Sequence, residues 1–120
     1  MDALTQEEKR VRDILISVAS KRSIIRYSEL CQKASLRLDM AIPAHRGEIG
    51  HILGNISAHE YDAGRPLLSS VVLSVGGEQG DGFFKLAEEL GFGEWKKLKN
   101  DGLFEVEMIK ETHDYWSKRS

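Results

Sequence analysis

Three side chains in the middle of the chain have the residue types of metal ligands. His45, Glu48 and His51 follow one another at intervals of three positions, so on a helix they would span about 120° and share a face. His59 follows and would add a further ligand. Helical zinc motifs prefer histidines four positions apart, however, and a His-Glu-x-x-His pattern is absent. A solvated polar face is the favoured interpretation, and a small metal-dependent enzyme that uses this group stays an alternative.

The candidate nucleophiles do not lie in catalytic patterns. Cys31, the only cysteine, falls between Leu30 and Gln32 in an amphipathic segment. This position predicts a small buried thiol rather than a reactive thiolate. Ser69 and Ser70 lie inside an apolar run and not in a Gly-x-Ser-x-Gly turn. We therefore assign no catalytic residue and predict no cofactor.

A glycine-rich segment over residues 76–82, Gly-Gly-Glu-Gln-Gly-Asp-Gly, follows an apolar run and precedes a helical pattern. Such a loop could present backbone N–H groups to a phosphate at a helix N-terminus. It lacks the lysine and the Ser/Thr of a P-loop, and the carboxylates of Glu78 and Asp81 would repel phosphate. A hairpin turn, whose glycines supply positive φ angles, is the favoured interpretation.

Basic side chains gather in the first half of the chain, where they could contact DNA. Arg46 lies at the start of an expected third helix, the place where helix-turn-helix proteins contact bases. On these grounds the candidate nucleic-acid-binding residues are Arg26, Arg46, His51, Asn55 and Arg65. The net charge of the whole chain is −2, so ordinary surface charge remains the alternative explanation of these residues.

Hydrophobic spacing indicates the elements that would position these residues. Thr5 and Glu8 form a capping box ahead of a first helix that ends near Ser20. The remaining expectations are a short extended segment at 23–27, helices at 29–34, 44–57, 83–90 and 103–117, a strand at 67–75, and Asp81 as the cap of the 83–90 helix. The 44–57 helix carries three glycines, which indicate either that another element packs closely on it or that it needs tertiary support.

The composition is that of one globular domain. Of 120 residues, 41% are hydrophobic and 30% are charged, and no apolar run approaches the roughly 18 residues of a membrane span. The first residues are acidic and lack the apolar core of a secretory signal. With a single cysteine, an intramolecular disulfide is impossible, and a cytoplasmic location is expected.

Two short motifs resemble a DNA-repair family. Tyr-Ser-Glu-Leu at 27–30, followed by Ile-Gly-His-Ile-Leu-Gly at 49–54, is similar to the alkyltransferase-like winged-helix domain of O6-alkylguanine repair. The resemblance implies a recognition helix, a glycine-tipped wing and a phosphate contact from Tyr27. The family's Pro-Cys-His-Arg signature has no counterpart in 67–75, so alkyl transfer to a thiolate is excluded, and the family's arginine aligns with Gly47.

The sequence therefore predicts an α+β domain over residues 1–120. It would have a winged-helix-like core at 1–91 and a C-terminal helical extension at 92–120. The predicted function is a non-enzymatic module that binds duplex DNA through the third helix and the glycine-rich wing. The alternative is a protein-interaction module of a bacterial or phage complex, with its partner on the C-terminal helices and no contact with membranes.

Overall fold

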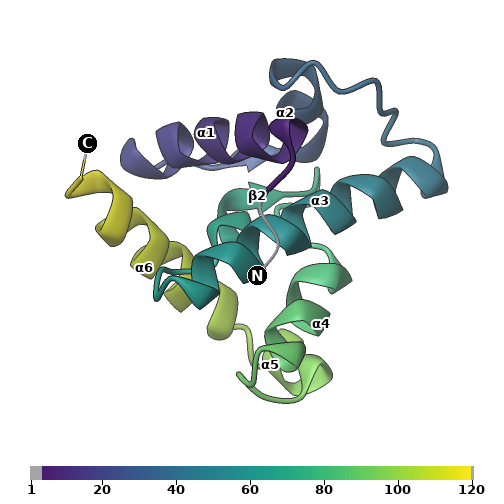
Figure 1. Ribbon diagram of the computed structural model, residues 1–120. Coiled ribbons are helices and arrows are strands. Elements are labelled where there is room, and N and C mark those ends of the chain that lie inside the picture. The colour runs from purple at the N-terminus through teal and green to yellow at the C-terminus, as the bar shows by residue number, and fades with distance from the viewer. Residues whose placement is uncertain (1–3, 120) are drawn as a thin grey trace.

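The chain folds into helices around one short central segment. The computed structural model describes residues 4–119, and Figure 1 shows how their elements are arranged. Its elements in order are α1 (Gln6–Ser20), β1 (Ile25–Arg26), α2 (Tyr27–Lys33), α3 (Pro43–Asp62), η1 (Leu68–Val71), β2 (Val72–Leu73), α4 (Asp81–Glu89), α5 (Trp95–Asp101) and α6 (Phe104–Ser117). Helices account for 66% of the residues and strands for 3%.

The predicted α+β winged-helix-like fold is wrong. The two strands have two residues each and pair in parallel, Ile25 with Val72 and Arg26 with Leu73. The glycine-rich segment does not turn back as a hairpin but leads into α4. Among residues 4–119 there is consequently no antiparallel wing, and the molecule is a mainly helical domain.

Only Val72 and Leu73 of the strand expected at 67–75 are a strand, and the residues before them form the 3-10 helix η1 (Leu68–Val71). η1 packs against α1, α3 and α6, and its apolar side chains Leu68 and Val71 are buried. The N–H of Ser69 donates to the Ser57 hydroxyl on α3 at 3.0 Å, and the N–H of Ser70 donates to the Leu67 carbonyl. These bonds replace the strand partner that the backbone would otherwise need. A continuous apolar run indicates burial on all sides, which a central 3-10 helix satisfies as well as a strand does.

The first helix forms as its sequence predicts. The Thr5 hydroxyl accepts from the Glu8 N–H at 3.0 Å, and the Glu8 carboxylate accepts from the Thr5 N–H at 2.9 Å, which completes the capping box. Val11, Leu15 and Ala19 then line one buried face. This face packs on α3, η1 and α6 and contributes to the larger of two apolar clusters.

The second cluster joins α4, α5 and α6. Phe83, Phe84, Ala87 and Met108 are buried in it, with Phe104 packed alongside. α6 also packs on α1 and η1, and the Thr112 hydroxyl donates to the Leu67 carbonyl at 3.3 Å. Among these three helices, α6 therefore links the second cluster to the central segment.

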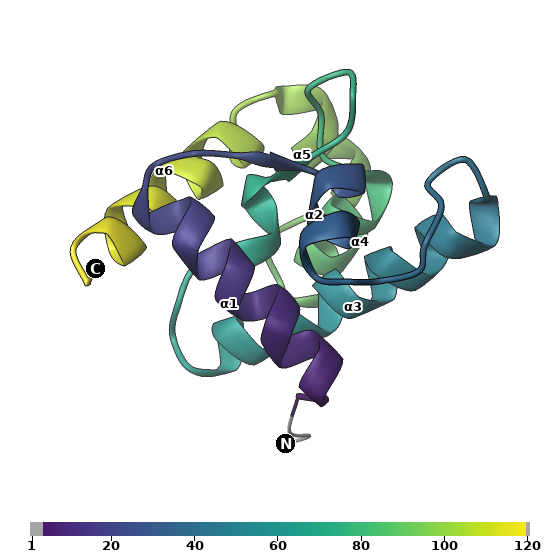
Figure 2. The ribbon, with the colours of Figure 1, turned by 90° about the horizontal axis from the view of Figure 1, so that it is seen from above.

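The third helix is longer than predicted and one of its ends stands apart from the body. It begins at Pro43, which needs no N–H there, and continues to Asp62 rather than ending near Ser57. Seen from above, its first turns and the preceding connection from α2 extend beyond the other helices (Figure 2). The buried residues of α3 come later and include Ile49, Leu53 and Ile56.

Candidate ligand-binding site

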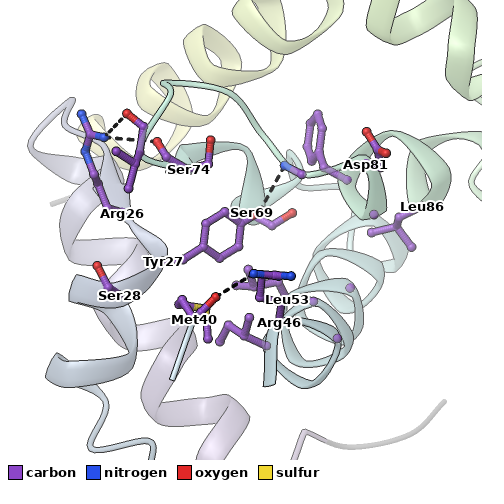
Figure 3. A pocket seen from close by; sticks show the side chains of 18 of the residues that line it. Arg26, Tyr27, Ser28, Met40, Arg46, Leu53, Ser69, Ser74, Asp81 and Leu86 are labelled. Carbon is purple, nitrogen blue, oxygen red and sulfur yellow. Dashed lines mark hydrogen bonds between the residues drawn. The ribbon is translucent and has the colours of Figure 1, made fainter. Parts of the chain in front are cut away.

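A pocket of about 780 Å³ separates α2 from the first half of α3. The loop at 74–80 and the start of α4 close its other sides (Figure 3). Apolar side chains from three parts of the chain line it, namely Met40, Ile49, Leu53, Phe83 and Leu86. Ligand pockets in proteins have volumes of about 300–1,000 Å³ and are lined mainly by apolar groups. The size and lining of this pocket are those of a ligand site.

Three glycines form one wall of the pocket. Gly47, Gly50 and Gly54 all line it, and apart from their chain neighbours and the nearby backbone of α3 itself, no heavy atom lies within 4 Å of a Cβ built on any of them. The prediction that another element packs closely on these glycines is therefore wrong. Their missing side chains leave open the space that becomes the pocket, so that the backbone of α3 is directly accessible.

Arg26 and Tyr27 hold the glycine-rich loop against this pocket. Arg26 Nη1 donates to the carbonyls of Ser74 and Val75, and the Gly80 N–H donates to Tyr27 Oη at 3.2 Å (Figure 3). A Cβ at Gly80 would lie 3.1 Å from the same oxygen, so a larger residue would crowd it. Burial raises the pKa of Tyr27, and the bond from Gly80 offsets this in part.

A buried glutamine fixes the other end of the loop. Gln79 Nε2 donates to the Ser70 carbonyl at 2.9 Å, and the Ser70 hydroxyl shares a hydrogen bond of 3.0 Å with Thr112. The Ser57 hydroxyl donates to Ser69 Oγ at 2.7 Å. The two serines considered as nucleophiles are thus buried structural residues, although part of Ser69 borders the pocket.

Arg46 lines the pocket from α3. Its Nη1 donates to the Met40 carbonyl at 3.0 Å. Within residues 4–119, neither Arg46 nor Arg26 forms an ion pair with a carboxylate. The only acidic side chain lining the pocket, Asp81, instead pairs with Lys99 at 2.5 Å. Asp81 lies in the first turn of α4 and Gly80 is the N-cap, which corrects the expectation that Asp81 caps the helix.

Two other candidate DNA contacts, His51 and Asn55, lie outside the pocket lining and face α1. Asn55 Nδ2 donates to Glu8 Oε2 at 2.8 Å and lies 3.3 Å from His51 Nε2. Burial would raise the pKa of Glu8, but hydrogen bonds from Thr5 and Asn55 outweigh it and the pKa is lowered. The pair thus links α3 to the start of α1.

The last candidate, Arg65, belongs to a buried ion-pair group. Arg65 Nε donates to Glu60 Oε1 at 2.8 Å, and Arg12 Nε donates to Glu60 Oε2 at 2.9 Å. The Glu60 side chain is fully buried. The Arg12 guanidinium also lies 5.7 Å from the centre of the Trp116 ring. The structure places Arg65 in a contact that joins α3 to α1, away from Arg26, Tyr27 and Arg46.

The histidines do not converge on a metal site. His45 Nδ1 accepts from the Asp39 N–H at 2.8 Å, His51 contacts Asn55, and His59 lies 3.9 Å from Glu60. Between Leu4 and Arg119 no three side chains of the His, Cys, Asp and Glu types are placed to hold a metal ion. Cys31 is buried, and burial raises the pKa of its thiol.

The site could be recognised in the sequence only in part. The charge pattern indicates Arg26 and Arg46, the resemblance indicates Tyr27, and the structure brings these three residues to one pocket. The apolar lining residues Met40 and Leu86 were missed. The signal that could have indicated the pocket is the spacing of the α3 glycines, which places them on one face of a helix with nothing to fill it.

Comparisons with known proteins do not assign the site. No protein-family model matches the chain, and no curated protein or solved structure is significantly similar to it. Across residues 4–119, no helix has the length and apolar character required to cross a membrane.

Proposed function

We propose that this protein is a non-enzymatic module that binds duplex DNA through the end of α3 that borders the pocket. One observation carries the proposal: Arg26 and Arg46, from separate elements, border the same pocket with no carboxylate partner among the described residues. Other arginines, such as Arg12, Arg22 and Arg65, are neutralised by ion pairs. Guanidinium groups without an acidic partner remain available for phosphate.

The accessible end of α3 supports the same proposal. Ala44, Arg46, Gly47 and Glu48 are all exposed there, beyond the packed part of the helix. A helix end that stands apart from the body can approach a groove without a clash from its neighbours. Arg26 Nε and Nη2 and Arg46 Nε and Nη2 make no hydrogen bond within residues 4–119, so they could donate to phosphate oxygens. The cytoplasm, where Cys31 stays reduced, is the location we propose.

The test is a fluorescence anisotropy titration with duplex and single-stranded DNA at two salt concentrations. We expect the wild type to bind duplex DNA at low salt, with an affinity that falls as salt rises. Arg46→Gln should weaken binding and reduce the salt slope by about 1, because one phosphate contact is lost. The double variant Arg46→Ala, Tyr27→Phe should bind more weakly still.

Lys118→Gln is the matched control for the change in net charge. Lys118 is exposed at the end of α6, on the opposite side of the molecule from the start of α3. The Lys118→Gln variant should bind DNA as the wild type does. The proposal fails if the wild type binds no DNA at low salt, and α3 is not the contact if Arg46→Gln and Lys118→Gln have equal effects.

A protein-interaction module is the second candidate, and the surface of α6 favours it. Val106 and the adjoining Leu103 are 59% and 57% exposed, while Trp95 and Trp116 are packed against the two apolar clusters. Apolar side chains that remain exposed are possible partner contacts. Self-association measured by sedimentation provides the first test, and it should disappear in Leu103→Ser, Val106→Ser if this surface is the contact.

A further inference from the structure

We propose that the pocket between α2, α3 and α4 is a binding site for a small, flat aromatic molecule that carries one anionic group. This goes beyond DNA binding, because a small molecule would occupy the interior of the pocket, whereas a phosphate backbone would contact the arginines from outside. Both proposals use the guanidinium groups of Arg26 and Arg46, but only the small molecule needs the apolar interior of the pocket, so the two proposals can fail separately.

The apolar part of the ligand is indicated by the walls. Ile49 and Leu53 come from α3, and Phe83 and Leu86 come from α4, so two helices present apolar side chains to a space of about 780 Å³. The Tyr27 ring projects into the same space in Figure 3. Apolar surface that a ligand removes from water stabilises the complex.

A flat shape is indicated by the glycine wall. Because Gly47, Gly50 and Gly54 have no side chains and nothing lies over them, a planar ring can rest directly on the backbone of α3. The phenol ring of Tyr27 provides an aromatic group for offset or edge-to-face contact with such a ring. A bulky branched ligand would make poorer use of this arrangement than a planar one.

The anionic group is indicated by the charges around the pocket. Arg26 and Arg46 line it, and the pocket's one acidic lining residue, Asp81, is already paired with Lys99. The balance of unpaired charge is therefore positive. Arginine binds carboxylate or sulfonate oxygens through a planar set of N–H donors, so Arg46 or Arg26 can hold such a group at the edge of the pocket.

The pocket is also formed in advance of binding. Three contacts hold the loop at 74–80 in place, from Arg26 to Ser74 and Val75, from Gly80 to Tyr27, and from Gln79 to Ser70. A site that needs little ordering on binding keeps more of its contact energy as affinity. The loop therefore serves as a fixed wall of the site.

The probe is 1-anilinonaphthalene-8-sulfonate, a flat aromatic anion whose fluorescence rises in apolar surroundings. Its neutral counterpart, N-phenyl-1-naphthylamine, has the same rings without the sulfonate. We expect the wild type to bind one equivalent of the sulfonate, and to bind it at least several-fold more tightly than the neutral compound. Arg46→Gln should remove most of this difference and leave affinity for the neutral compound nearly unchanged.

Gly50→Leu fills the pocket from its glycine wall and should reduce the affinity for both probes at least tenfold. Ala44→Leu adds the same side chain to α3 outside the pocket lining and should leave both affinities unchanged. Thermal unfolding checks that each variant is folded, and Gly54→Leu replaces Gly50→Leu if that variant is not. Gly50→Leu and Gly54→Leu both leave Arg26 and Arg46 in place, so DNA binding through these arginines should persist in either variant.

Several results would overturn the proposal. These are the absence of saturable binding to the wild type, binding of several equivalents, or equal binding by folded Gly50→Leu and Ala44→Leu. Equal affinity for the sulfonate and the neutral probe would show that the site does not select a ligand with an anionic group. If the wild type binds the probe one to one but binds no DNA, the proposed function fails and the ligand site stands.

Discussion

Arg12 of α1 and Arg65, which follows α3, both pair with the Glu60 carboxylate of α3, and Arg65 Nε lies 2.8 Å from Glu60 Oε1. The carboxylate is fully buried, whereas each arginine side chain keeps about a fifth of its surface exposed, at 23% for Arg12 and 22% for Arg65. Each oxygen of Glu60 accepts from both guanidinium groups. A residue selected from the sequence as a DNA contact thus holds two helices together.

Replacement of Glu60 by glutamine should destabilise the fold strongly. The amide has no charge to balance the two arginines, and breaking a buried pair costs about 3–5 kcal/mol. Urea unfolding should show this as a lower midpoint. Glu107→Gln, on the exposed surface of α6, makes the same chemical change and should alter the free energy of unfolding by less than about 0.5 kcal/mol. Similar midpoints for the two variants would show that Glu60 contributes little.

Stability should decrease in acid because of the same carboxylate. Burial would raise the pKa of Glu60, but the hydrogen bonds from Arg65 and Arg12 outweigh burial and the pKa is lowered. A carboxyl with a lowered pKa stabilises the fold fully above its unfolded pKa, about 4.3, and this contribution is lost as the pH falls through the folded pKa. The melting temperature should therefore drop below about pH 4. In Glu60→Gln the drop should be shallower, and an identical pH profile would contradict this assignment.

Gly50→Ala should stabilise the protein by up to about 1 kcal/mol. Gly50 lies within α3, and its added methyl group would meet no atom within 4 Å apart from its chain neighbours and the nearby backbone of α3. Alanine also favours a helix over glycine. Gly64→Ala is the opposite case, because Gly64 has a φ of +76° and a side chain there costs about 1–2 kcal/mol. Urea unfolding of both variants should give changes of opposite sign. A loss of stability in Gly50→Ala would mean that the glycine wall is covered.

Cys31 should react slowly with Ellman's reagent in the folded protein. Its side chain is buried, and burial raises the pKa of the thiol, so little thiolate is present or accessible at neutral pH. Reaction should become rapid in denaturing urea. Cys31→Ser should cost roughly 1 kcal/mol and leave DNA and probe binding intact. Fast native labelling, or loss of binding in a folded Cys31→Ser variant, would show that the thiol is part of a site.

Local sequence signals were sufficient to predict a helix where its formation depends on residues close to one another in the chain. The capping box of Thr5 and Glu8 and the apolar stripe of α1 predict that helix with its N-terminus, because both rely on contacts within one or two turns. The start of α3 at Pro43 is similarly local. The thiol of Cys31 is free because the chain has a single cysteine. Its burial follows from its place in an amphipathic segment.

The tertiary structure alone decided the roles of the arginines proposed to contact DNA and the form of the central segment. Arg46 and Arg65 have the same side chain, yet one lines a pocket and the other pairs with Glu60. The apolar pattern around Leu68 specifies burial but not backbone shape, and Ser57, on another helix, supplies the hydrogen bond that a strand partner would have made. Contacts between residues far apart in the chain determine these outcomes, because a buried donor or charge must be satisfied by whichever group the fold brings to it.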